Sequence, residues 1–176
     1  HSATTPTDKK VLAEMTPYFR NKFGNPSSLH SFGQEAVKGV DQAREQIARL
    51  LNCQAHEIVF TSGATESDNL AVKGLIKSLQ KKDKSKKYHI ITSAIEHSAV
   101  LEPCAELERE GTEVTYLPVG KNGIIDIDGL KKSIKDNTGL ISIMYINSEG
   151  GGGEPINNIG KIIHKINKKR LKEWKN

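Results

Sequence analysis

The stretch YHIITSAIEHSAVLEPCAELEREGTEVTYL (residues 88–117) predicts a strand, a helix and a second strand in immediate succession. The β-branched apolar run at 88–92 predicts the first strand, and the run at 113–117 predicts the second. Between them, apolar residues recur at helical spacing over 99–110. This order is typical of parallel strands joined by a helical crossover, so it indicates an α/β protein.

The same alternation continues on both sides of this stretch. Further helices are predicted at 33–51, 70–80 and near 128–135, further strands at 57–61 and 140–146, and a last helix that begins near 156. We therefore expect a three-layer α/β/α fold with a mainly parallel sheet. An N-terminal segment (1–32) would precede this core (33–160), and a basic tail (161–176) would follow it.

The composition indicates a globular domain without a membrane span. Hydrophobic residues make up 36% and charged residues 27% of the 176 positions. No apolar run is long enough to cross a bilayer and no secretory signal pattern is present, so we expect the cytoplasm or an equivalent reducing compartment. Cys53 and Cys104 lie far apart without metal-ligand spacing, which argues against a disulfide framework and a metal site.

The positive charge is concentrated in two lysine-rich segments. The net charge is +5, and the lysines cluster at 81–87 and 161–175. Aromatic residues do not alternate with them, which favours a solvated surface over a nucleic-acid site. We expect neither nucleic acid nor a membrane as a partner.

Three loops at predicted strand ends carry the candidate chemistry. They are 62–69, 93–98 and 147–154, and in parallel sheets ligands bind where strands end at their carboxyl side. The first lies within TSGATESDN (61–69), where small residues precede a helix. Taken alone, this stretch supports two alternatives equally: a cradle for an anionic group at a helix N-terminus, or an ordinary helix cap.

The second loop contains the pair Glu96-His97 between a strand and a helix. An imidazole there can transfer protons or lie against an aromatic ligand. Taken alone, a partly buried histidine hydrogen-bonded at a helix start is the favoured alternative. Cys104 falls within a helical pattern, where a buried thiol is favoured over a nucleophile.

A more specific pattern comes from six stretches taken together: ATTPTDKKVLAEMTPYF, FGNPSSLHSFG, EIVFTSGATESDNLAVKG, HIITSAIEHSAVL, EREGTEVTYLPV and GLISIMYIN. In order and spacing they resemble the NifS/IscS-like cysteine desulfurases. These belong to the fold-type I (aminotransferase class V) enzymes, which use pyridoxal 5′-phosphate (PLP). The resemblance implies that residues 1–176 are the N-terminal part of a PLP-dependent transferase large domain. It also implies a homodimer that takes sulfur from L-cysteine and leaves L-alanine and an enzyme persulfide. The persulfide sulfur would pass to iron–sulfur scaffold or sulfur-acceptor proteins in iron–sulfur cluster assembly.

The resemblance also assigns site residues. It places Ala64 and Thr65 at the cofactor phosphate, and it gives His97 a catalytic role in stacking on the pyridine ring and moving protons. Asn147 keeps the first asparagine of a motif near the cofactor. Ser148 stands where the family has a second asparagine, near the ring oxygen and the substrate.

Several features of the family pattern are missing from these 176 residues. A glycine run occupies 150–153, and no lysine lies in the Ser-x-His-Lys segment that forms the Schiff base. Neither cysteine matches the persulfide cysteine, and the aspartate that pairs with the pyridine nitrogen is absent. We therefore expect less than half of a desulfurase chain, inactive alone. The alternative is a truncated, non-catalytic paralogue that acts as an interaction or scaffold module.

Overall fold

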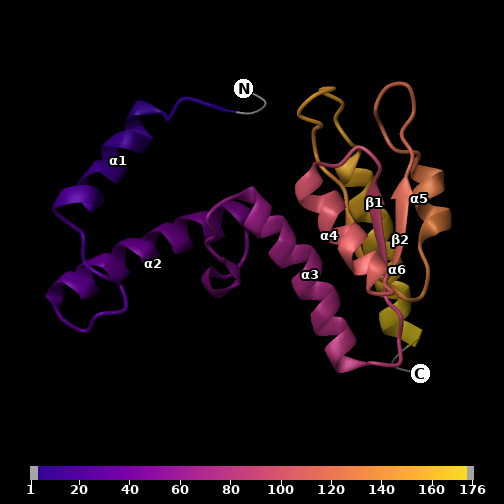
Figure 1. The fold of residues 1–176 in the computed structure, drawn as a ribbon, viewed down its shortest axis with the longest axis horizontal. Coiled ribbons are helices and arrows are strands. Elements are labelled where there is room, and N and C mark those ends of the chain that lie inside the picture. Colours follow the sequence, from indigo (N-terminus) through magenta and orange to yellow (C-terminus); the bar gives the residue numbers. More distant parts are fainter. Residues whose placement is uncertain (1–3, 174–176) are drawn as a thin grey trace. The chain divides into compact units, whose positions relative to one another are not determined.

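The computed structural model describes residues 4–173 and divides into two compact units (Figure 1). The first unit ends at Phe60 and the second begins at Thr61. The first three residues of the predicted N-terminal segment and the last three of the predicted basic tail lie outside the described residues.

The first unit is helical. Its elements are α1 (Lys9–Arg20), α2 (Ser31–Leu51) and a short 3-10 helix, η1 (Ala55–Glu57). The Asp8 carboxylate caps α1 by accepting a hydrogen bond from the Lys10 N–H at 2.7 Å. Helix α2 ends at Leu51, and the left-handed backbone of its C-cap Asn52 (φ 53°) turns the Cys53 N–H back to the Ala48 carbonyl at 3.0 Å.

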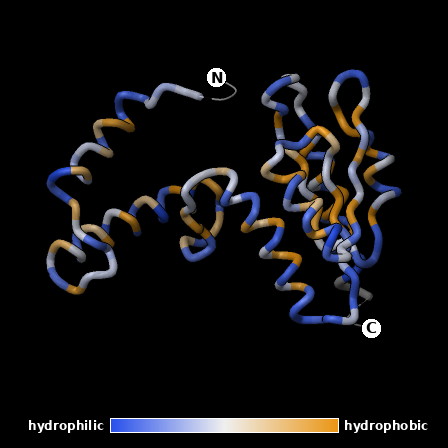
Figure 2. Tube along the Cα trace, in the orientation of Figure 1, coloured by the Kyte–Doolittle hydropathy of each residue, from blue (hydrophilic) through white to orange (hydrophobic). Residues whose placement is uncertain are grey.

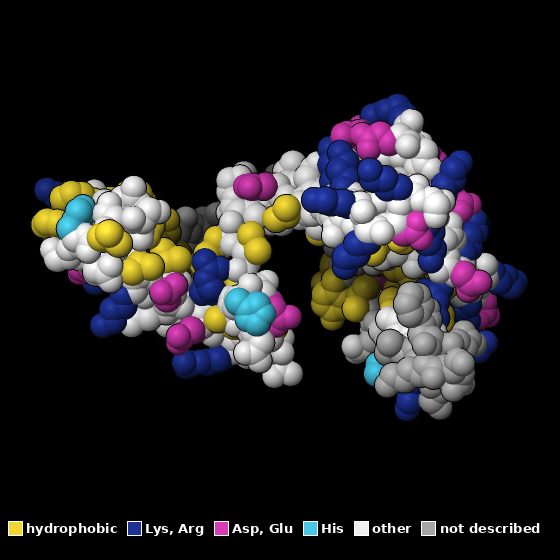
Figure 3. All heavy atoms as spheres, turned by 90° about the horizontal axis from the view of Figure 1, so that it is seen from below, with side chains coloured by type: hydrophobic (Ala, Val, Ile, Leu, Met, Phe, Trp, Pro, Cys, Tyr) yellow, Lys and Arg dark blue, Asp and Glu magenta, His cyan; other side chains and the backbone are white. Residues whose placement is uncertain are grey.

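Many large apolar side chains of the first unit are exposed. Figure 3 shows them as yellow patches on the part that holds α1 and α2. They include Val11, Leu12, Met15, Tyr18, Phe19, Phe23, Leu29, Phe32, Leu50, Leu51, Val59 and Phe60. Exposed apolar surface of this extent marks a contact surface in soluble proteins.

The strand predicted at 57–61 is wrong, because residues 58–61 form no strand in the described chain. The segment has a strand-like composition, but no neighbouring strand pairs with its backbone. Instead the Arg44 guanidinium donates a hydrogen bond to the Ile58 carbonyl and lies 4.9 Å from the centre of the Phe60 ring. A β-branched run becomes a strand only where a partner strand takes its backbone hydrogen bonds.

The second unit alternates helices and strands. Its elements are α3 (Ala64–Lys82), β1 (His89–Ser93), α4 (Ser98–Arg109), β2 (Glu113–Leu117), α5 (Ile127–Ser133), β3 (Thr138–Ser142) and α6 (Ile156–Glu173). Helix α3 begins at Ala64 rather than near residue 70, and β3 ends at Ser142 rather than at 146. Helix α6 extends through most of the segment predicted as a basic tail.

The strands form one parallel sheet in the order β2-β1-β3. Ile90 of β1 pairs with Val114 of β2 and with Leu140 of β3. Every residue of β1 is buried, as expected for the central strand of a sheet covered on both faces.

Two apolar clusters fill the two faces of the sheet. One joins α3 and α4 to the sheet and includes Val72, Ile76, Ile90, Val100, Cys104 and Leu107. The other joins α5 and α6 to the opposite face and includes Ile91, Leu117, Ile125, Leu130 and Ile159. In Figure 2 the hydrophobic, orange segments gather in the sheet and the helix faces around it. The predicted three-layer α/β/α architecture is confirmed in this unit.

Candidate functional site

The candidate residues all lie in the second unit, at the carboxyl ends of strands or at the start of α3. The loop between β1 and α4 carries Glu96 and His97, and the segment after β3 carries Asn147 and Ser148. Ala64 and Thr65 form the first turn of α3. The fold therefore puts the loops after β1 and β3 where parallel sheets bind ligands, and it puts Ala64 and Thr65 at a helix N-terminus.

The start of α3 combines a helix N-cap with backbone N–H groups that donate no hydrogen bond within the described residues. Gly63 is the N-cap and offers no side-chain bond, while the Glu66 carboxylate accepts from the Ser62 N–H (2.7 Å) and hydroxyl (2.6 Å). These two bonds lower the pKa of Glu66. Within the described residues, the N–H groups of Ala64 and Thr65 make no hydrogen bond, and both residues are exposed. Two free N–H groups at the positive end of a helix dipole fit a phosphate.

His97 is the N-cap of α4. Its Nδ1 accepts a hydrogen bond from the Ala99 N–H at 3.1 Å, and the residue is exposed. Because Nδ1 is an acceptor, the neutral imidazole carries its proton on Nε2. The histidine thus serves as a helix cap and still presents one ring nitrogen for chemistry.

The side chain of Asn147 is already fully used by the protein. Its Nδ2 donates to the Ile95 carbonyl at 3.1 Å, and its Oδ1 accepts from the N–H groups of Glu149 (2.9 Å) and Gly150 (2.7 Å). Ser148 is exposed. In the following turn Gly151 has φ +68°, a backbone conformation that favours glycine.

Two cavities lie beside these loops. Thr65 lines one of them together with Ser98 and Ala99 from the start of α4. Asn147 lines the other together with Ile95 and Glu96. The structure therefore brings Thr65 to the start of α4 and Asn147 to the preceding loop.

Glu96 has a structural role that its position in the sequence did not reveal. It is only 8% exposed, and its Oε1 accepts a hydrogen bond from the Met144 N–H at 2.6 Å. Burial raises the pKa of this carboxyl, the nearby carboxylates of Asp68 and Glu154 add to the rise, and the Met144 N–H opposes it. The only sequence signal was an acid directly before a candidate histidine.

Glu154 is a second buried carboxylate that sequence reasoning missed. Its Oε2 accepts from the Ile125 N–H at 3.1 Å, whereas its Oε1 is buried without a partner in the described part of the chain. The sequence signal was its place at the end of the candidate loop 147–154, directly after the glycine run.

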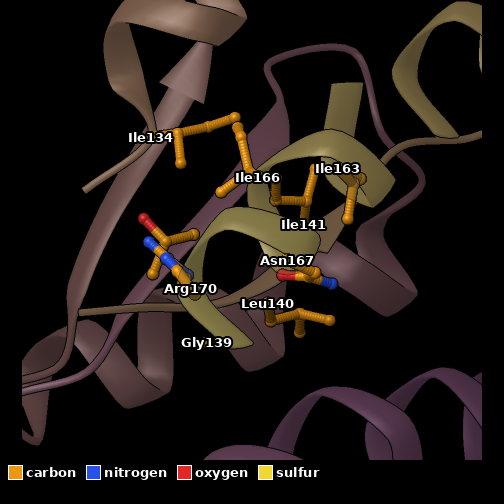
Figure 4. Close-up of a pocket in the computed structure, with 9 residues that line it drawn as sticks. Ile134, Gly139, Leu140, Ile141, Ile163, Ile166, Asn167 and Arg170 are labelled. Atoms are coloured by element: carbon orange, nitrogen blue, oxygen red, sulfur yellow. The ribbon is translucent and has the colours of Figure 1, made fainter. Parts of the chain in front are cut away.

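A separate apolar cavity lies between α6 and the amino-terminal part of β3 (Figure 4). Ile134, Ile141, Ile163 and Ile166 line it, and the Arg170 guanidinium beside it donates to the Lys135 carbonyl at 2.5 Å. It holds no acid, histidine or cysteine. This cavity is therefore not the candidate catalytic site.

The described part of the chain offers neither a metal-binding cluster nor a membrane span. Among residues 4–173, no three histidine, cysteine, aspartate or glutamate side chains gather closely enough to hold a metal ion. None of the helices in this range is both long and apolar enough to cross a membrane.

Comparison with known proteins identifies the family. A model of the class-V aminotransferases matches residues 1–171. The chain therefore belongs to the class-V aminotransferase family. Its relatives include cysteine desulfurase IscS of Rickettsia bellii (strain OSU 85-389), 53% identical over 163 residues, and that of Dictyoglomus turgidum (strain DSM 6724 / Z-1310), 51% identical over 162. The predicted resemblance to cysteine desulfurases is confirmed.

The matches cover nearly all of this chain but less than half of each relative. The two IscS proteins align with 92% of this chain, which corresponds to 39% and 40% of their own lengths. A solved NifS-like protein superposes with a TM-score of 0.87 at 41% identity, covering 95% of this chain and 45% of that one. The structure of SspA in complex with cysteine gives a TM-score of 0.85 at 42% identity, covering 94% and 47%.

Proposed function

We propose that this chain is part of a cysteine desulfurase and supplies the phosphate-binding and ring-facing side of its PLP site. One observation carries this proposal: Thr65, at the open first turn of α3, and the start of α4 next to His97 line the same cavity. The IscS relatives support the reaction class.

The first turn of α3 would hold the cofactor phosphate. The Ala64 and Thr65 N–H groups and the Thr65 hydroxyl are donors, and the helix dipole adds a partial positive charge. The Glu66 carboxylate already uses the donors of Ser62, so the phosphate would depend on the two N–H groups of the first turn.

His97 would face the cofactor ring and exchange protons at Nε2, because Nδ1 is held by the Ala99 N–H. Bound PLP supplies an electron-withdrawing pyridine ring that stabilises negative charge on the substrate. Ser148, at the edge of the same loops, would offer a hydroxyl toward the substrate.

The substrate of the complete enzyme would be L-cysteine. Its carbon–sulfur bond is broken, the carbon skeleton leaves as L-alanine, and the sulfur joins a cysteine thiolate of the enzyme as a persulfide. We further propose that the complete protein is a homodimer that passes this sulfur to iron–sulfur cluster assembly. The free cysteines suit a reducing compartment such as the cytoplasm.

Phosphate binding can be tested with a substitution at the first position of α3. Proline is well tolerated there and removes only the N–H, so Ala64→Pro keeps the helix and deletes one donor. We expect it to lower the affinity for PLP and for inorganic phosphate by about tenfold, the loss typical of one hydrogen bond to a charged group. Equilibrium dialysis measures the affinity, and Ala64→Ser, which retains the N–H, is the matched control. Equal affinities in both variants contradict the proposal.

Turnover provides a second test. Residues 1–176 contain no Ser-x-His-Lys segment, so we expect no sulfide or alanine from this chain alone with PLP and L-cysteine. An absorption band that survives dialysis and disappears on borohydride reduction would show that another lysine binds the cofactor covalently.

A non-catalytic interaction module is the second candidate. The exposed apolar side chains of the first unit favour it, because such surface marks contacts with another protein. The intact mass of the natural product decides: a longer protein supports the desulfurase, and a native end near residue 176 supports the module.

A further inference from the structure

We propose that Glu96 and Asn147 are positioning residues that orient His97 by joining the β1–α4 loop to the segment after β3. His97 acts on the cofactor only if the proposed function is correct, so this part of the inference rests on it. The joining of the two segments is a property of the protein itself.

The first link is made by the Glu96 side chain. It reaches from the β1–α4 loop to the Met144 N–H, 48 positions along the chain, at 2.6 Å. Hydrogen bonds that involve an ionised group are shorter and stronger than neutral ones. This bond therefore fixes the residue directly before His97 to the segment after β3.

The second link is made by the Asn147 amide. Its Nδ2 donates to the Ile95 carbonyl, so the two residues that precede His97 are each tied to the segment after β3. Its Oδ1 holds the N–H groups of Glu149 and Gly150, which shapes the turn that carries Ser148. One side chain thus connects the loop of His97 with the loop of Ser148.

The surroundings of Glu96 argue against a simple contribution to stability. The carboxylate is buried, and the charged groups that most affect it, Asp68 and Glu154, are acids. A buried carboxylate among other acids is costly, and a glutamine would accept the same hydrogen bond at lower cost. The bond contributes a defined loop geometry, and His97 is the next residue in that loop.

The experiment compares Glu96→Ala, which deletes the acceptor, with Glu96→Gln, which keeps it. In Glu96→Ala we expect Met144 amide exchange to accelerate at least about tenfold, the loss of one hydrogen bond to a charged group. The ¹⁵N signals of His97 should show that the Nε2-protonated tautomer is no longer dominant, and PLP affinity should fall by about tenfold. Glu96→Gln should stay within about threefold of the wild-type chain in both the Met144 exchange rate and the PLP affinity.

Two further variants complete the design. Asn147→Asp keeps Oδ1 but loses the donor to Ile95, and it should change the His97 tautomer and PLP affinity in the same direction as Glu96→Ala. Glu108→Gln, an exposed change at the far end of α4, is the control and should alter nothing. Because Glu96→Gln and Asn147→Asp retain most contacts, they decide the question even if Glu96→Ala fails to fold.

The inference is wrong if the His97 tautomer is the same in Glu96→Ala or Asn147→Asp as in the wild-type chain. It is also wrong if Glu96→Gln disturbs His97 as much as alanine does while Met144 stays protected. Failure of the wild-type chain to bind PLP overturns the proposed function instead, since tautomer and exchange rates are measured without the cofactor.

Discussion

The buried His89 provides the most quantitative prediction. It lies in the central strand β1, is 0% exposed, and bonds through both ring nitrogens across the sheet. Nδ1 lies 2.8 Å from the Thr138 hydroxyl and Nε2 lies 2.8 Å from the Thr115 hydroxyl. The Thr138 oxygen also accepts a hydrogen bond from the Lys135 N–H, and the tautomer of His89 decides which of its two ring nitrogens donates.

The perturbation is His89→Leu, which fills a similar volume without polar atoms. It deletes two hydrogen bonds and leaves two threonine hydroxyls half-buried. At about 1 kcal/mol for each bond, we expect the free energy of unfolding to fall by about 2–3 kcal/mol. The Thr138 oxygen keeps its bond from the Lys135 N–H, whereas the Thr115 hydroxyl loses its bond to His89; adding Thr115→Val removes that hydroxyl, and we expect it to restore about 1 kcal/mol.

The pH dependence of stability gives an independent check. Burial lowers the pKa of His89, the Glu113 carboxylate opposes this, and the Lys135 ammonium adds to it. With a folded-state pKa below the unfolded one, stability is complete above the ordinary histidine pKa of about 6.5 and falls as the pH drops toward the folded-state value. One proton gives a slope of at most about 1.4 kcal/mol per pH unit, and His89→Leu removes it.

Urea unfolding followed by far-ultraviolet circular dichroism measures both effects at pH about 7.5 and about 5.5. The raised pKa of Glu96 acts in the opposite direction, but it is common to both proteins, so the difference between them isolates His89. Equal slopes in the wild-type chain and His89→Leu would refute the reasoning. So would a loss below about 0.5 kcal/mol at the higher pH, since that is the size of an ordinary surface change.

Three further predictions concern single positions. Gly33→Ala places a Cβ 2.1 Å from the Ser28 carbonyl oxygen, a backbone atom. Overpacking should therefore lower the free energy of unfolding by about 1–3 kcal/mol in thermal unfolding, and unchanged stability would contradict this. Burial raises the pKa of Cys104 to about 11, so iodoacetamide should label Cys53 at least about tenfold faster than Cys104. Mass spectrometry measures both labelling rates, and equal rates would contradict the prediction. Glu66→Gln removes a negative charge beside the first turn of α3 and should raise the affinity for inorganic phosphate about threefold at low salt. Phosphorus NMR measures this binding, and an unchanged affinity would contradict a phosphate site at the start of α3.

Several elements were predicted almost to the residue from local pattern. The helix expected at 99–110 is α4 (Ser98–Arg109), the strand at 113–117 is β2 (Glu113–Leu117), and α6 begins at Ile156 as expected. Each has an apolar periodicity that matches its own buried face. For these elements the neighbours in the fold and the local sequence favour the same conformation.

The errors arose where distant partners decide the conformation. The run at 57–61 has β-forming residues but no partner strand among residues 4–173. The early start of α3, six residues before its apolar pattern, has a local setting instead. Gly63 is the N-cap, and the Glu66 carboxylate in the first turn accepts from the N–H and hydroxyl of Ser62. Such polar contacts do not appear in hydrophobic periodicity.

The sequence by itself determined the family, the α/β alternation and the loops that carry His97, Asn147 and Ser148, because these depend on local order and spacing. Tertiary structure alone decided how those side chains are used. In the folded chain the Asn147 amide donates to the Ile95 carbonyl, and the buried Glu96 carboxylate accepts from the Met144 N–H. His89 lies between two threonines of the neighbouring strands. Hydrogen-bond partners and burial depend on which segments far apart in the sequence come into contact, and these contacts cannot be predicted from the spacing of residues along the chain.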